Sequence, residues 1–184
     1  IQRMKKSLIL AALVIATGSL FAQKKTTTSA TVAFDASTSL DALPKAENKT
    51  VIAAIDTKAG TVQFEAAVKN FAFSNPTMQE HFNSGNWLNS EKFPTFTFSG
   101  KIEDLSKVNF AKDGSYTTTV SGNLTVKDVT KTVTAPATVV VAKGAVSAKT
   151  AFSIVLADYG VTGAPITAGK VAAQPKITVS ADFN

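Results

Sequence analysis

Cysteine is absent from this chain of 184 residues, and polar aromatic side chains are scarce: one His, one Trp and two Tyr. Without cysteine there is no disulfide bond, no thiolate nucleophile and no zinc site with cysteine ligands. The single histidine, His81, cannot form a metal site with two histidine ligands. No Gly-x-Ser-x-Gly segment, the mark of a hydrolase nucleophile, occurs either. The sequence therefore argues against an enzyme.

Arginine occurs once, at position 3, and charged residues make up only 17% of the chain. Three of the basic residues, Arg3, Lys5 and Lys6, precede residue 22, so the net charge of +6 falls to about +3 for the remainder. Proteins that bind nucleic acids usually contact phosphates and bases through arginine. The other lysines are scattered, and we expect no nucleic-acid partner.

The N-terminal segment has the pattern of a secretory signal peptide. Two lysines follow Met4, and the apolar stretch from Leu8 to Ala16 is too short to span a bilayer as a helix. Ala22 suits the residue before the cleavage point. We expect a signal peptide over residues 1–22 and one domain over residues 23–184, periplasmic or secreted and not membrane-integral after cleavage. An uncleaved N-terminal anchor is the alternative.

The remainder of the chain alternates apolar with polar residues, which is typical of half-buried strands. Eight such segments lie at residues 31–35, 51–55, 62–68, 95–99, 116–127, 133–141, 152–156 and 177–183. Most connections are short and contain the Gly or Asp that tight turns favour. Asp128 is expected in the turn near residues 126–130 with a left-handed conformation.

Two connections are longer. Pro76 and the residues after it predict a short helix near residues 76–83, and residues 159–174 predict an irregular loop. The alternation changes phase between Val68 and Phe71, which predicts a β-bulge near Asn70.

Eight mostly antiparallel strands with one apolar face predict an all-β fold, an extended eight-stranded barrel whose closure leaves no exposed edge. Such a barrel is filled by its own side chains or holds one small ligand. Two alternatives stay open at this point. One is a β-sandwich binding or adhesion module with a solid core, and the other is an outer-membrane barrel.

The interior candidates combine large aromatic residues on some strands with alanine on others, which would leave room for an extended hydrocarbon. For any single Phe, core filling and ligand contact are equally open, and His81 fits either an exposed helix position or the mouth of a cavity. The residues that we expect to line a cavity are Phe64, Phe71, Phe73, Met78, His81, Phe82, Trp87, Phe96, Phe98, Tyr116, Phe152 and Ile154. We identify no catalytic residue and no metal ligand.

Three parts of the chain carry a family resemblance: Met78–Gly100, Gly122–Lys131, and Ala151–Ile154 followed by Asp158–Gly160. Together they resemble the YceI-like family of secreted, lipocalin-like proteins that bind polyisoprenoid lipids. The resemblance implies an extended eight-stranded barrel around an amphiphilic lipid, with no cofactor other than a bound isoprenoid; a homodimer is left open. Asp128 stands where the family usually has Gly, and Val68–Phe71 occupies a region where the family has a His.

Overall fold

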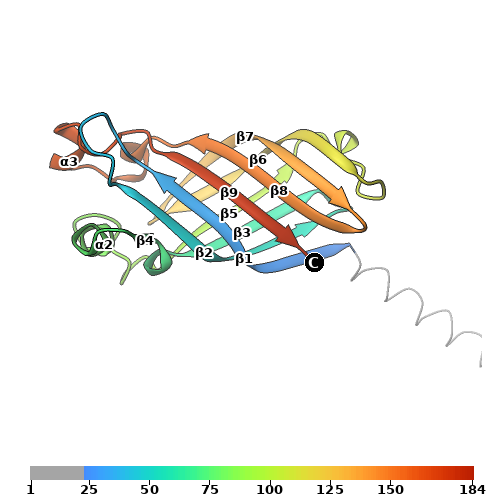
Figure 1. The fold of residues 1–184 in the computed structure, drawn as a ribbon, viewed down its shortest axis with the longest axis horizontal. Coiled ribbons are helices and arrows are strands. Elements are labelled where there is room, and N and C mark those ends of the chain that lie inside the picture. The colour runs from blue at the N-terminus through green and yellow to red at the C-terminus, as the bar shows by residue number, and fades with distance from the viewer. Residues whose placement is uncertain (1–22) are drawn as a thin grey trace, which may run out of the picture.

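Eight antiparallel strands close into a barrel (Figure 1). The computed structural model describes residues 23–184, and the expected signal peptide, residues 1–22, lies outside the described residues. Around the barrel the order is β1-β9-β8-β7-β6-β5-β3-β2, and β2 pairs with β1 to complete the ring. The strands are β1 (Lys24–Asp35), β2 (Lys45–Asp56), β3 (Thr61–Ala67), β5 (Thr95–Ile102), β6 (Gly114–Val126), β7 (Val129–Ala142), β8 (Ala145–Ser153) and β9 (Lys176–Phe183). This confirms the predicted fold, and the β-sandwich alternative is wrong.

The change of phase after β3 has a different cause from the one expected. The predicted bulge near Asn70 is wrong: β3 ends at Ala67 and a 3-10 turn, η1 (Val68–Asn70), follows, before the two-residue strand β4 (Ala72–Phe73) pairs with the start of β2. The buried amide of Asn48 holds this turn, because its Nδ2 donates a hydrogen bond to the carbonyl of Ala67 over 2.9 Å. The register irregularities lie instead in the β1–β2 pair, on either side of Ala30.

The tight turns contain residues with a left-handed backbone. In one turn, the left-handed residue is not the one that the sequence predicted. Gly60 (φ 71°) and Gly144 (φ 82°) have the positive φ that glycine adopts without steric cost. In the turn between β6 and β7, however, the left-handed residue is Lys127 (φ 58°) and not Asp128. The Asp found where the family usually has Gly therefore needs no left-handed backbone.

The short helices gather at one end of the barrel, which we call the helical end. The helix α2 (Pro76–Asn83) lies where the sequence predicted it, and Asn75 caps it by accepting hydrogen bonds from the amides of Thr77 and Met78. The connection over residues 159–174, expected to be irregular, follows the 3-10 turn η3 (Leu156–Tyr159) and contains the one-turn helix α3 (Ala164–Thr167). Both α2 and α3 lie away from the C-terminus (Figure 1).

The opposite end, which we call the hairpin end, is tightly packed. It contains the turns β2–β3 and β7–β8, the C-terminus, and a longer loop with the 3-10 turn η2 (Leu105–Lys107). Large apolar side chains from the strands and this loop fill the interior here. These residues are at most 6% exposed: Ile55, Ile102, Val108, Val139, Val141 and Val146.

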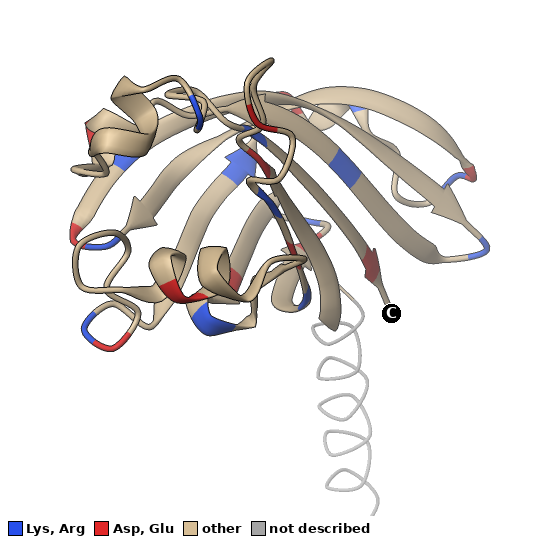
Figure 2. Ribbon diagram, turned by 60° about the vertical axis from the view of Figure 1, so that its left-hand side comes forward, with Lys and Arg blue, Asp and Glu red and all other residues tan. Residues whose placement is uncertain are grey.

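The outer face of the barrel is mostly polar, with Ile52 on β2 and Val140 on β7 as exposed apolar exceptions. On β3, Gln63 and Glu65 are exposed and alternate with the buried Val62 and Ala66, and basic and acidic positions are interspersed along the strands and loops (Figure 2). Among the described residues, no helix has the length and apolar character needed to cross a bilayer.

Candidate functional site

The half of the barrel nearer the helical end is hollow. The centre of a water molecule can move through about 170 Å³ inside it. A space of this size would hold roughly ten water molecules. All eight strands of the ring contribute inward side chains to the walls. Several wall residues, such as Phe152 and Ile177, are only half-buried although they point inward, because part of their surface faces this space.

The lining is almost entirely apolar. Polar residues contribute only at Thr97, Lys149, Thr150 and Tyr159, and the hydroxyl of Thr150 already donates a hydrogen bond to the carbonyl of Pro136 over 2.7 Å. The remaining lining residues are aliphatic or aromatic: Val32, Phe34, Val51, Val62, Phe64, Ala66, Phe71, Phe82, Trp87, Leu88, Phe96, Phe98, Val120, Leu124, Val126, Val133, Ala135, Ala137, Ala148, Phe152, Ile154, Leu156, Val161, Ile177, Val179 and Phe183. An interior of this composition suits an apolar molecule.

Two connections meet over the helical end of the cavity. Phe82 from α2 and Trp87 from the loop after it approach from one side, and Tyr159 and Val161 approach from the other. A Cβ atom added at Gly163 would lie 3.7 Å from the ring of Trp87, so the two connections lie close together there. Gly163 also has φ 148°, which other residues rarely adopt.

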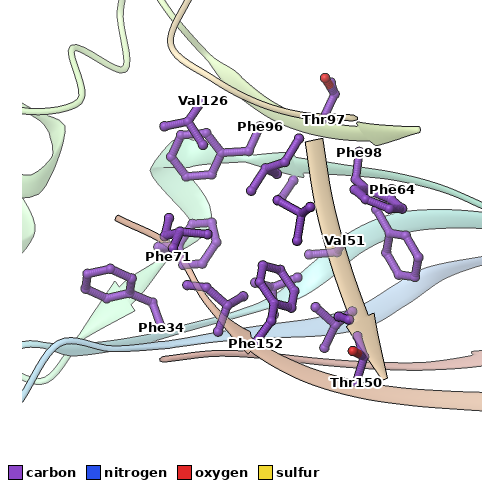
Figure 3. A pocket seen from close by; sticks show the side chains of 18 of the residues that line it. Phe34, Val51, Phe64, Phe71, Phe96, Thr97, Phe98, Val126, Thr150 and Phe152 are labelled. Carbon is purple, nitrogen blue, oxygen red and sulfur yellow. The ribbon is translucent and has the colours of Figure 1, made fainter. Parts of the chain in front are cut away.

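Aromatic rings cluster beneath these connections. The ring of Phe82 lies 6.0 Å from that of Phe34, 5.8 Å from Phe71 and 4.9 Å from Phe73, and Phe71 in turn lies 5.8 Å from Phe96. Tilted or edge-to-face pairs at such centroid distances are favourable beyond the area that they bury. Figure 3 shows Phe34 and Phe71 on one side of the cavity and Phe64 and Phe98 on the other.

The structure brings eight of the twelve sequence-predicted residues into the lining: Phe64, Phe71, Phe82, Trp87, Phe96, Phe98, Phe152 and Ile154. The other four lie elsewhere. Phe73 packs behind Phe82, Met78 is half-buried on α2, and His81 is exposed on the same helix. Tyr116 lies toward the hairpin end, where its hydroxyl donates to the carbonyl of Lys112 over 2.8 Å.

Several lining residues lie outside the predicted set, which consists mainly of aromatic residues from the central segment of the chain. Leu124, Val133 and Ile177 have the inward phase of predicted strand segments, so the alternation alone indicated them, whereas Ala148 precedes the predicted segment 152–156. No sequence pattern indicated Tyr159, because it lies in the irregular connection, where apolar and polar residues do not alternate.

Tyr159 is the cavity-lining residue whose pKa is shifted from its usual value. The residue is 3% exposed, and burial raises the pKa of its phenol, with a further contribution from the neighbouring Asp158. The hydroxyl therefore stays neutral at physiological pH and can take part in hydrogen bonds. Within residues 23–184, no group of three or more His, Asp or Glu side chains is arranged to hold a metal ion. The chemistry that this arrangement supports is binding.

Comparisons with known proteins agree with this geometry. The fold is similar to BcnA of Burkholderia cenocepacia (TM-score 0.69, 19% identity, 84% of this chain and 96% of that one). It is also similar to a polyisoprenoid binding domain from Saccharophagus degradans implicated in plant cell wall breakdown (TM-score 0.73, 13% identity, 88% of this chain and 98% of that one). A third similar structure is the YceI protein of Campylobacter jejuni (TM-score 0.55, 18% identity, 73% of this chain and 80% of that one).

A search of curated proteins found no match. The family model described as the YceI-like domain, in contrast, matches residues 16–183, which is most of the chain. The resemblance seen in the three sequence segments is confirmed: this chain belongs to the YceI-like family.

Proposed function

We propose that the protein binds the hydrocarbon chain of an amphiphilic lipid, without catalysing a reaction on it. One observation carries this proposal: the closed barrel contains an apolar cavity that its own side chains leave unfilled. Natural cavities without polar groups favour apolar guests, because water inside them finds too few hydrogen-bond partners. The structure similar to this one from Saccharophagus degradans is a polyisoprenoid binding domain, which supports an isoprenoid chain as the ligand class.

Burial of the chain supplies the binding free energy. Each methylene removed from water contributes about 0.8 kcal/mol, so ten would give on the order of 8 kcal/mol before the costs of association and ordering. The neutral hydroxyl of Tyr159, near the helical end, is available to the polar end of the ligand. The signal-peptide pattern of residues 1–22 favours a periplasmic or secreted site of action.

Cavity blocking tests the proposal. Ala148 on β8 lines the cavity, and Ala151 on the same strand is exposed on the outer face. We expect Ala148→Phe to weaken binding of the C20 alcohol geranylgeraniol and of palmitate at least tenfold, because the new ring occupies their space. Ala151→Phe adds the same ring outside the barrel and should leave both affinities unchanged.

Binding is measured by displacement of a fluorescent fatty acid, and thermal unfolding checks that both variants fold. Organic extraction of the freshly purified protein followed by mass spectrometry should identify a co-purified lipid. A wild-type protein that carries no lipid and takes up neither compound would exclude the proposed function.

A further inference from the structure

The walls of the cavity contain one place where two neighbouring strands present no side chain. Gly100 on β5 is paired directly with Gly122 on β6. Both glycines have the inward phase of their strands, in step with the cavity-lining residues Phe98 and Leu124. On the inside of the barrel, the backbones of β5 and β6 are therefore bare at this level.

The ring of Phe98 lies over this bare backbone. A Cβ atom added at Gly100 or at Gly122 would stand only 2.7 Å from Cζ at the tip of the Phe98 ring. The same added atoms would approach the backbone of the opposite strand to 2.4–2.5 Å, so the strands could not remain this close with any side chain there. The ring of one residue thus fills the space that two side chains would otherwise occupy.

This ring lies near the boundary between the hollow and packed parts of the barrel. On its hairpin side, Val62 and Val120 still line the cavity, whereas Ile102, the strand partner of Val120, does not. Phe98 is paired across the strands with Phe64, and Figure 3 shows both on the side of the cavity away from Phe34 and Phe71. One inward position beyond Gly100 is Ile102, which is 4% exposed and belongs to the packed interior of the hairpin end.

We propose that Phe98, seated on Gly100 and Gly122, sets the depth of the cavity and so the longest hydrocarbon chain that can be fully buried. This inference rests on the proposed function and adds to it a determinant of chain length. Removal of the Phe98 ring uncovers the space above the glycine pair, which adds volume at the hairpin side of the cavity, next to Val62 and Val120. Chains longer by several methylenes then fit inside the barrel.

The signature of such a limit is a break in a plot of affinity against chain length. Each buried methylene strengthens binding about fourfold. A chain that already reaches the end of the cavity must leave additional methylenes in water, where they add little. Saturated fatty acids from eight to eighteen carbons are suitable probes, measured by displacement of a fluorescent fatty acid at concentrations below micelle formation.

We expect the wild-type affinity to rise with length and then level off. In Phe98→Ala the break moves to chains longer by several carbons, and in Phe98→Leu, which keeps part of the volume, it moves less. Phe96→Ala is the matched control, because it removes the same ring from the same strand one inward position nearer the helical end. That variant should weaken binding of all chain lengths and leave the break where it is. Thermal unfolding shows whether each variant is folded; Phe98→Leu gives the test if Phe98→Ala is not.

The outcomes separate this inference from the proposed function. A break that does not move in a folded Phe98 variant, or that moves equally in Phe96→Ala, overturns the assignment of Phe98 while lipid binding itself stands. A wild-type protein that binds none of the fatty acids and no geranylgeraniol overturns both. A break that moves in the Phe98 variants alone supports the inference.

Discussion

The two halves of the barrel are built from the same strands and are filled differently. On β7, Val139 and Val141 are 2% exposed in the packed half, whereas Val133, six residues before Val139 on the same face, is half-exposed to the cavity. In the packed half, large side chains project from many strands, and the η2 loop adds Val108. In the hollow half, alanines line part of the wall, namely Ala66, Ala135, Ala137 and Ala148.

The comparison shows that alternation and side-chain volume have separate roles. Period-two alternation directs apolar residues inward along the whole length of each strand and so specifies the barrel. The volume of those residues then decides whether a given level of the barrel is solid or hollow. Under the proposed function, a lining position in the hollow half contributes to binding, whereas an equivalent position in the packed half contributes to stability.

The largest expected effect comes from removing the same side chain in each half. Ile55 is 1% exposed in the packed half, and Ile177 lines the cavity. Ile55→Ala should lower the free energy of unfolding by about 2–5 kcal/mol, because it leaves a new void among packed neighbours. Ile177→Ala only enlarges an existing space and should cost about 1 kcal/mol or less. Urea unfolding of the delipidated proteins measures both; equal losses would mean that the halves do not differ in packing.

Adding volume should give a smaller contrast of the same kind. Val139→Phe forces a ring into a filled interior and should lower the free energy of unfolding by about 1–3 kcal/mol. Val133→Phe places the ring in empty space, so we expect a change within about 0.5 kcal/mol together with weaker binding of geranylgeraniol. The two positions lie on the same strand and face, which makes each the control for the other. A Val133→Phe variant as unstable as Val139→Phe would show that the cavity does not accept side chains.

Most of the fold was predictable from sequence because the strands repeat a simple pattern. The alternation from Val62 to Ala66 and from Tyr116 to Val126 gave both the strands and their inward face. The turn η1, which begins at Val68, was not predictable in the same way. It depends on the buried amide of Asn48, about twenty residues earlier in the sequence, and no local pattern announces such a contact.

The type of site, an apolar cavity, was easier to predict from the sequence than the individual residues that line it. Aromatic type alone does not distinguish Phe82, which lines the cavity, from Phe73, which packs behind it. Tyr116 has the correct inward phase, yet it lies in the wrong half. The depth of a residue within the barrel depends on the stagger between strands, and the sequence of a single strand does not contain that information.

The smallest expected effect is on the free energy of unfolding at acidic pH, and it should be similar for the two ends of the barrel. At the helical end, hydrogen bonds from the hydroxyl and amide of Ser37, with Lys45 3.3 Å away, hold the pKa of Asp35 below its usual value. At the hairpin end, the amides of Ala59 and Lys58 lower the pKa of Asp56 in the same way. Both ends therefore carry a carboxylate that is favoured in its charged form.

A lowered pKa in the folded state means that the unfolded chain binds the proton more readily, so stability falls as the pH decreases. The contribution of each aspartate is complete above the unfolded pKa, near 3.8, and is lost as the pH falls toward the lower folded value. Asp35→Asn and Asp56→Asn should both flatten the fall in the free energy of unfolding between pH 5 and pH 3, a region that urea titrations at several pH values can map. For Asp35, whose side chain is 42% exposed, solvent screening keeps the effect under about 1 kcal/mol. Asp182→Asn, which removes a charge from β9 outside both turns, is the control. If only one of the two variants changed the slope, the two ends would differ in surface electrostatics as well as in packing.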